Sequence, residues 1–360
     1  MSKILSYIAP DKKSLDIKSF DSAEQIRALN KIGLQLDDMV SNSQGMDAAT
    51  FTTPNVGAPI QHLQNWLPGF VKEVTTARKI DTLLGVTTVG NWHDEEIVQG
   101  VAERTAHVAE YGDFTNTPMS DYNTEFEKRT VVRFEDGYMG GTLARERAEA
   151  YGVDDYGMKR SASLIALEIV RNEVGFYGYN NGNNKTYGLL NDPNLPAYDD
   201  VATGDGGDTT WETKTYLEIT ADIIEAANTI RTQSGDNVDP YKDELRFVIA
   251  SNSVGFLSTL NVQGTISVRK WIRDTFPNWV IESAPEFNEA DGGENVFYLY
   301  APSLKGDSSD NGRTFEQLVP SRLRTLGQEA RAKGFTELFS NATAGVLCKR
   351  PYLVVRRSGI

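Results

Sequence analysis

"DYNTEFEKRTVVRFED", residues 121–136, is the stretch of sequence that decides the fold of this chain. Its even positions are largely apolar or β-branched, and its odd positions are mostly charged. An alternation with a period of two is typical of a β-strand that has one charged face. The alternation continues well beyond the common strand length of about five or six residues. The sequence therefore predicts one unusually long strand here.

The residues before this stretch predict its partner strand. Residues 86–111, "VTTVGNWHDEEIVQGVAERTAHVAEY", also have the pattern of a strand, and "GDFTNTP" at 112–118 supplies a turn. Together the two strands form a long β-hairpin. Because an isolated hairpin is marginally stable in water, we expect it to complete a larger sheet or to lie on another subunit.

The composition is that of a globular protein. Of the 360 residues, 39% are hydrophobic and 24% are charged, which is enough apolar material for a core. The single cysteine, Cys348, excludes an internal disulfide framework and a zinc site with several cysteines. No run of 18 apolar residues and no signal-peptide core occurs, which predicts a protein without membrane association in a reducing cytoplasm.

The charge is acidic overall and unevenly distributed. A net charge of −14 argues against binding to a phosphate backbone. Residues 322–357 nevertheless hold eight basic side chains and two acidic ones, whereas the loop at 199–212 is acidic. This segregation favours a protein whose copies meet acidic face to basic face.

Other segments predict an arm, a long helix and an α+β subdomain. Residues 1–66 include the polar, Pro- and Gly-punctuated stretch 41–59, which indicates an extended arm ordered by a neighbouring copy. A helix is predicted over 156–177, capped by Asp154 or Asp155. Helical and strand patterns alternate over 206–314, and strand patterns return over 315–360. The predicted core face of the long helix consists of Met158, Ala162, Ile165, Ile169 and Phe176, widened by Ala166 and Val170, with Arg171 in water.

Motifs for catalysis, cofactors and metals were sought, and the sequence predicts none. "GNNKT" at 182–186 lacks the glycines of a phosphate-binding loop, since Asn184 and Tyr179 occupy their positions, and it follows a helix rather than a strand. The surrounding loop, rich in Asn and Gly, is better explained as a turn-rich connector. The three histidines form no ligand pair. An enzyme or carbohydrate-binding module that uses the tryptophans is an alternative, although Trp66, Trp92, Trp211, Trp271 and Trp279 are scattered, which favours packing.

The order of these parts resembles the major capsid proteins of tailed bacteriophages with the Hong Kong 97-type fold. The resemblance covers nearly the whole chain and rests on "FEDGYMGGTLARERAEAYGVDDYGMKRSASLIALEIVRNEVGFYG" and on the closing "GVLCKRPYLVVRRSGI". It implies an α+β capsid fold with a long spine helix in its peripheral domain. The implied parts are an N-terminal arm (1–66), a peripheral domain (67–85, 136–205 and 315–360), an extended loop formed by the long hairpin (86–135) and an axial domain (206–314).

The resemblance also implies the function. Such a protein self-assembles into pentamers and hexamers that form an icosahedral head shell around packaged double-stranded DNA, without enzymatic activity or a cofactor. Its partners are other copies of itself, with scaffold, portal and decoration proteins as further candidates. It is assembled in the host cytoplasm and resides in the virion, without a membrane partner. The alternatives are an encapsulin-type compartment shell and a phage tail or baseplate protein.

Candidate contact residues follow from the charge pattern and from the resemblance. The residues predicted to contact neighbouring subunits are Glu125, Glu127, Lys128, Arg129, Arg133, Arg350, Arg356 and Arg357. Some members of the family join subunits through a Lys–Asn isopeptide bond. The pair that the resemblance offers here is Lys128 with Asn341, with Glu337 as the base, although ordinary surface roles are favoured for all three.

Overall fold

The computed structural model describes residues 75–360 except 114–115, 151, 181, 305 and 307. These residues belong to one compact unit, Val74–Ile360. The arm predicted at 1–66, including Trp66, lies outside the described residues. No helix in the described part of the chain is long and apolar enough to cross a membrane.

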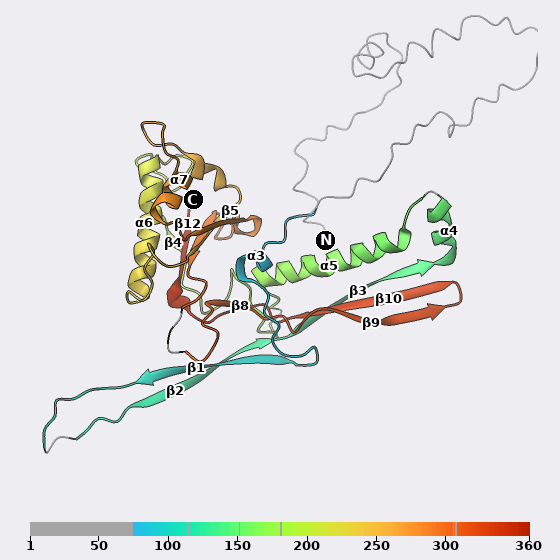
Figure 1. Ribbon diagram of the computed structural model, residues 1–360, viewed down its shortest axis with the longest axis horizontal. Coiled ribbons are helices and arrows are strands. Elements are labelled where there is room, and N and C mark those ends of the chain that lie inside the picture. Colours follow the sequence, from blue (N-terminus) through green and yellow to red (C-terminus); the bar gives the residue numbers. More distant parts are fainter. Residues whose placement is uncertain (1–74, 114–115, 151, 181, 305, 307) are drawn as a thin grey trace, which may run out of the picture. The chain divides into compact units, whose positions relative to one another are not determined.

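A five-stranded mixed sheet forms the centre of the first subdomain (Figure 1). Its strands, in spatial order, are β4 (Asp199–Asp200), β12 (Val354–Ser358), β7 (Val296–Tyr300), β5 (Arg246–Ala250) and β6 (Val280–Ala284). β7 runs antiparallel to both of its neighbours, whereas β5 and β6 are parallel. Every residue of β7 is buried, so both faces of the sheet are covered.

Alternate residues of the central strands enter two different cores. Phe247 and Phe297 pack against α6 (Tyr216–Gln233) and α7 (Val268–Thr275), together with Trp211 and Trp279. On the other face, Val248, Val296 and Tyr298 pack with the short helix α3 (Ile80–Leu84), the end of helix α5 (Asp155–Tyr177) and strand β8 (Phe315–Gln317). Trp211 and Trp279 are therefore core residues rather than parts of an exposed aromatic platform.

The helices and strands predicted within 206–314 are confirmed, but the boundary of the subdomain is not. The sequence assigned the last strand to the segment that returns to the peripheral domain, whereas β12 lies in the five-stranded sheet, between β4 and β7. Val354 and Val355 point to opposite faces and are both buried, which requires a layer on each side. The five-stranded sheet has a core on each of its faces and so covers both sides of β12. The remaining short elements are η2 (Val254–Ser258), η3 (Pro285–Phe287) and η4 (Pro351–Leu353).

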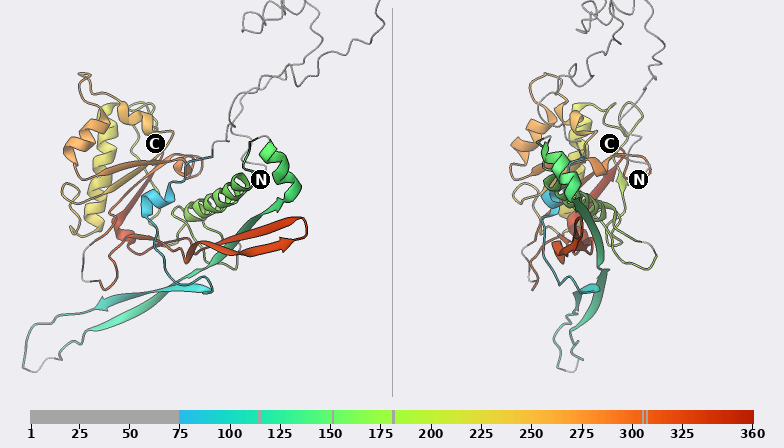
Figure 2. Two further views of the ribbon diagram at one scale, coloured as in Figure 1. Left: turned by 45° about the vertical axis from the view of Figure 1, so that its right-hand side comes forward. Right: turned by 90° about the vertical axis from the view of Figure 1, so that its right-hand side faces the viewer.

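The second subdomain is a long helix on a three-stranded antiparallel sheet (Figure 2). The helix is α5 (Asp155–Tyr177), preceded by α4 (Thr142–Ala150), and the sheet order is β3 (Val132–Gly141), β10 (Gly334–Thr343), β9 (Ser321–Arg331). The Asp154 side chain accepts a hydrogen bond from the Gly157 N–H, which confirms the predicted cap. Tyr156 packs edge-on against Phe335, with ring centroids 5.0 Å apart.

The buried face of α5 differs from the predicted one. Met158 is exposed, whereas Arg171 is buried and its guanidinium donates two hydrogen bonds to Asp81. Asn172 Oδ1 accepts the N–H groups of Lys79 and Ile80. The helix contacts both the three-stranded sheet and α3, and the second contact combines these polar bonds with the packing of Gly175 against Ile80. Residues buried on α5 are Ser163, Leu167, Arg171, Asn172, Val174, Gly175 and Phe176.

The predicted hairpin is present, but its two strands are shorter than the strand patterns in the sequence. Strands β1 (Glu96–Thr105) and β2 (Asp121–Thr130) pair antiparallel in an uninterrupted register. Residues 86–95 and 106–111 are not part of a strand, and the stretch 121–136 breaks at Val131. There the chain changes partner, because β2 pairs with β1 and β3 pairs with β10. A separate pair, β8 with β11 (Val346–Cys348), buries Cys348.

Candidate functional site

The hairpin has two chemically different faces. Directly paired residues share a face, and Gly100 pairs with Phe126 while Val101 pairs with Glu125. We name the first the apolar face and the second the acidic face. The apolar face presents Val98, Gly100, Ala102, Tyr122, Thr124 and Phe126, with Glu96 and Lys128 paired near its base and Arg104 opposite Tyr122. The acidic face presents Glu103, Asp121, Glu125 and Glu127.

A buried ion pair anchors the base of the hairpin. Arg129 is 1% exposed and Asp192 is 4% exposed, and their Nη2 and Oδ2 atoms lie 2.9 Å apart. The Arg129 guanidinium also donates to Glu127 Oε2 at 3.0 Å. Asp192 Oδ2 accepts in addition from the Cys348 N–H at 3.1 Å. The prediction that Arg129 points outward to a neighbour is therefore wrong, because an internal carboxylate binds it.

The connector after α5 completes the anchor. Its ends close on themselves, with the Tyr179 N–H donating to the Thr186 carbonyl at 2.9 Å. Thr130, the last residue of β2, is held through all three of its polar groups: its hydroxyl accepts from the Lys185 N–H, its carbonyl accepts from the Thr186 hydroxyl, and its N–H donates to the Lys185 carbonyl. A Cβ atom on Gly188 would lie 2.3 Å from the Phe176 carbonyl oxygen, so only glycine fits there. The turn residues predicted in the connector therefore allow it to pack against the base of the hairpin.

Arg133 is also engaged within the subunit. Its guanidinium donates to the carbonyl oxygens of Trp92 and Asp94, each at 2.7 Å. The Arg324 guanidinium lies 4.5 Å from the centroid of the Trp92 ring, so Arg324 belongs to the same cluster of side chains as Arg133 and Trp92. This cluster fixes the segment before β1 to β3. Arg133 is thus not the outward-facing charge that the alternation predicted.

The three C-terminal arginines are buried in the subunit as well. Arg350 forms a two-pronged pair with Asp310, with contacts of 2.6 and 3.1 Å. Arg356 stacks on Tyr198 at 3.8 Å from the ring centroid. Arg357 bonds Asp199 and Glu225 at 2.5 and 3.2 Å. Of the predicted contact residues, Glu125 and Lys128 are exposed and Glu127 is half-buried.

The residues named for an isopeptide bond are arranged unfavourably for it. Asn341 is 1% exposed under α5, and its Nδ2 donates to the Leu167 carbonyl oxygen at 2.8 Å. Glu337 Oε2 accepts from the Tyr138 hydroxyl at 2.7 Å, and burial together with this bond raises the pKa of Tyr138 to about 12. Lys128 pairs with Glu96 at 3.1 Å. A lysine from another copy would have to separate α5 from β10 to reach Asn341.

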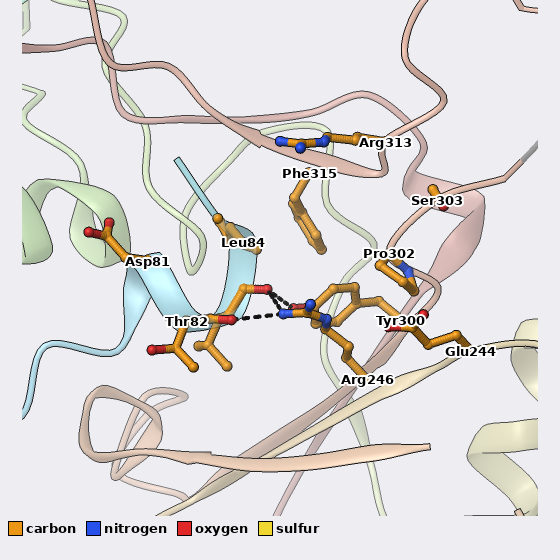
Figure 3. A pocket seen from close by; sticks show the side chains of 12 residues that line it. Asp81, Thr82, Leu84, Glu244, Arg246, Tyr300, Pro302, Ser303, Arg313 and Phe315 are labelled. Carbon is orange, nitrogen blue, oxygen red and sulfur yellow. Dashed lines mark hydrogen bonds between the residues drawn. The ribbon is translucent and has the colours of Figure 1, made fainter. Parts of the chain in front are cut away.

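A cavity of about 440 Å³ lies beside α3 (Figure 3). Its cationic groups already have protein partners. Arg246 donates to the carbonyl oxygens of Thr82 and Leu83, and the Tyr300 hydroxyl donates to Leu83 as well. Arg313 donates to Thr87. The Arg246 and Tyr300 contacts cap the C-terminal end of α3, so these lining groups have a structural role. Within the described residues, no group of three His, Cys, Asp or Glu side chains is placed to hold a metal.

Comparison with solved structures shows which fold the chain has. The chain is similar to the capsid of Myoviridae phage XM1, with a TM-score of 0.67 and 17% identity over 85% of this chain and 100% of that one. It is also similar to the capsid of a native GTA particle, with a TM-score of 0.57 and 11% identity over 86% and 99% of the two chains. These matches show a Hong Kong 97-like capsid fold with mixed α and β content.

Sequence comparison gives the family. The family described as "Pa193 gp26 major capsid protein" matches residues 49–359, which is most of the chain. The chain belongs to this family. No curated protein matches the sequence. The protein is therefore a major capsid protein of a phage head and a component of the virion, and its family is structural rather than enzymatic.

Sequence reasoning missed Asp192, the partner of Arg129. Its position in "NDPNL" suggested only a turn, and it is 63 residues from Arg129. A hairpin that belonged to a closed β-sandwich would have favoured the tail or baseplate alternative. Instead, β1 and β2 form a two-stranded sheet of their own.

Proposed function

We propose that this protein self-assembles into pentamers and hexamers that close into an icosahedral head shell around double-stranded DNA. The observation that carries the proposal is the hairpin, whose two strands expose large apolar side chains in the single subunit. A two-stranded hairpin with an uncovered apolar face is marginal in water. Contact with another copy would cover that face, and capsid folds supply many identical copies.

The parts of the subunit follow from this proposal. The hairpin Glu96–Thr130 is the centre of the extended loop assigned to 86–135, and α5 with β3, β9 and β10 forms the peripheral domain. The five-stranded sheet with α6 and α7 forms the axial domain that surrounds the symmetry centres, now including β12. Residues 1–66 are the N-terminal arm.

The enclosed DNA and the other partners are proposed on charge and on family grounds. A shell lined by basic side chains would bind DNA tightly, because such binding releases counterions from the phosphate backbone. The net charge of −14 disfavours this binding. Scaffold, portal and decoration proteins are further partners, and assembly takes place in the host cytoplasm. None of these roles needs a catalytic residue.

The test is assembly of the full chain with and without the hairpin. In the variant, residues 99–127 are replaced by Asn-Gly, so that Val98 and Lys128 are joined by a two-residue turn and the Arg129 anchor is kept. We expect light scattering and negative-stain microscopy to show rings or shells for the full chain, and monomers with native circular dichroism for the variant. Shells formed without the hairpin would contradict its role. A full chain that stays monomeric when expressed in bacterial cells would contradict self-assembly.

A further inference from the structure

A carboxyl group joins the two subdomains. Glu286 lies in η3, which directly follows β6 of the five-stranded sheet, and its Oε1 accepts a hydrogen bond of 2.6 Å from Asn172 Nδ2 on α5. Asn172 Oδ1 in turn accepts the backbone N–H groups of Lys79 and Ile80, at 3.0 and 3.2 Å. One amide side chain therefore connects η3, α5 and the start of α3. We name these four residues the junction.

The second oxygen of this carboxyl group has no partner. Glu286 Oε2 is buried and forms no hydrogen bond within the described part of the chain. An ionised carboxylate carries charge on both oxygens and can accept about four hydrogen bonds, so it is poorly satisfied here. Burial raises the pKa of Glu286, and this effect outweighs the opposing effects of the Asn172 bond and of the Lys79 charge. The junction therefore fits the protonated side chain better than the ionised one.

The charged and titratable neighbours do not remove this mismatch. Lys79 is a cation, but its Nζ lies 3.8 Å from Glu282 Oε2 on β6, so its charge is shared. The Tyr177 hydroxyl on α5 donates to the Glu286 backbone carbonyl at 3.5 Å and not to its carboxylate. Burial, followed by the charges of Glu286 and Glu173, raises the pKa of Tyr177, so this hydroxyl keeps its proton at neutral pH.

Contacts that do not titrate flank the junction. The rings of Phe176 and Phe287 meet edge-on, with centroids 6.2 Å apart. Gly175 packs against Ile80, since a Cβ atom on the glycine would lie 2.6 Å from Ile80 Cγ1. These apolar contacts hold the subdomains together at any pH. The ionisation of Glu286 can therefore change how firmly the junction is closed without unfolding the subunit.

We propose that Glu286 is a pH-sensitive switch at the junction of the two subdomains. When it is protonated, the junction is closed and η3 is held to α5 and to the start of α3. When it is ionised, the charge on the buried oxygen favours opening, in which the carboxylate reaches water. This inference concerns the single subunit and does not depend on self-assembly.

The direction of the pH dependence follows from linkage. The closed junction retains the proton at a pH where an opened junction, with an ordinary glutamate pKa of about 4.3, has already lost it. Opening therefore becomes more favourable as the pH rises from about 4.3 to the raised pKa of Glu286, and it levels off above that value. A difference of one unit between the two pKa values corresponds to a tenfold change in the opening equilibrium.

Hydrogen exchange of the full chain tests the switch. Peptides that cover 79–84 and 285–290 report on the junction, and the N–H groups of Lys79 and Ile80 are themselves part of it. After correction for the intrinsic pH dependence of exchange, we expect protection in the unchanged protein to fall about tenfold between pH 4.5 and pH 8. Glu286→Gln keeps an oxygen for Asn172 but cannot ionise, so its protection should stay within about twofold over this range.

A neighbouring carboxylate supplies the matched control. Glu282→Gln removes the partner of Lys79 from β6, and we expect it to leave the pH dependence of protection in place. Residues 219–230 of α6 form the internal control, because they pack in the other core. Samples are compared at equal light scattering, so that assembly does not change the protection. Protection that is independent of pH in the unchanged protein, or equally dependent on pH in Glu286→Gln, would overturn the inference.

The melting temperature gives a second, independent readout. We expect Glu286→Gln to melt a few degrees above the unchanged protein at pH 8, because the buried charge is gone, with the difference vanishing near pH 4.5. A Glu286→Gln variant that melts no higher than the unchanged protein at pH 8 would contradict the switch. Loss of the pH dependence in Glu282→Gln but not in Glu286→Gln would assign the switch to the wrong carboxylate and would also overturn the inference.

Discussion

At the scale of single residues, the subunit uses buried arginines to tie together segments that are distant in sequence. Arg129 joins the hairpin to Asp192 in the connector, and Arg171 joins α5 to Asp81 in α3. Arg350 joins the segment before β12 to Asp310. A buried pair adds little stability compared with a packed apolar pair, but losing one partner leaves a charge without compensation. These arginines therefore define geometry, and the hairpin anchor defines the geometry on which the proposed assembly depends.

We predict that Arg129→Met destabilises the subunit by about 3–5 kcal/mol, because it leaves the Asp192 carboxylate buried without its cation. Urea unfolding would measure this change, and hydrogen exchange over residues 96–130 would show faster exchange in the hairpin. The double variant Arg129→Met/Asp192→Leu should regain part of the lost stability. It should not regain all of it, since the Cys348 N–H then loses its acceptor. A single variant as stable as the unchanged protein would contradict the role of the anchor.

At the scale of elements, the sequence predicted those whose signals are local. The cap of α5 at Asp154 and the alternation of helices and strands over 206–314 were predicted from a capping residue and from local apolar patterns. The errors occurred where the structure of a segment depends on a partner that is distant in sequence. The alternation of 121–136 continues through Val131, and only the positions of β1 and β10 show that the strand divides there. Likewise, Arg171 is buried as the partner of Asp81, which lies 90 residues away in the sequence. The polar side of α5 could therefore not be predicted from helical periodicity.

Helix α6 allows a prediction about pH. Glu218 accepts hydrogen bonds from the Asp205 N–H at 2.6 Å and from the Thr215 N–H and hydroxyl at 2.7 Å, within a capping box. These bonds, that of Asp205 above all, lower the pKa of Glu218 to about 2. A lowered carboxyl pKa contributes stability above the unfolded value, and this contribution is lost as the pH falls through the folded value.

The change to make is Glu218→Ala. We expect it to lower the melting temperature at pH 7, with the difference from the unchanged protein shrinking as the pH falls from about 4.5 towards 2. Glu212→Ala is the control, because it removes an exposed carboxylate three residues before the cap residue Thr215. A difference in melting temperature that stays constant down to pH 3 would show that the carboxylate charge is not what stabilises the cap.

At the scale of the whole molecule, two kinds of electrostatic force act between copies. The net charge of −14 makes whole subunits repel each other at long range. Local attraction between oppositely charged segments of two copies, such as the acidic residues 96–130 and the basic residues 321–343, would act only when the copies are close. The family supplies the context, since a capsid protein must approach many identical neighbours. The apolar contact proposed above is short-ranged and nearly independent of salt, so the salt dependence of assembly can separate these contributions.

We predict that assembly starts faster at 0.15 M salt than at 0.01 M. The Debye length is about 30 Å at 0.01 M, so a subunit experiences the full charge of its neighbour, whereas at 0.15 M it is about 8 Å and only nearby charges act. At 1 M, where it is about 3 Å, the local attraction is screened as well, but the apolar face still holds the copies and particles persist. Stopped-flow light scattering would measure the initial rate, and sucrose at matched osmolality would separate screening from solute exclusion. Assembly that is fastest at 0.01 M and absent at 1 M would mean that ion pairs rather than the apolar face join the subunits. The acidic face of the hairpin would then be the one that is buried.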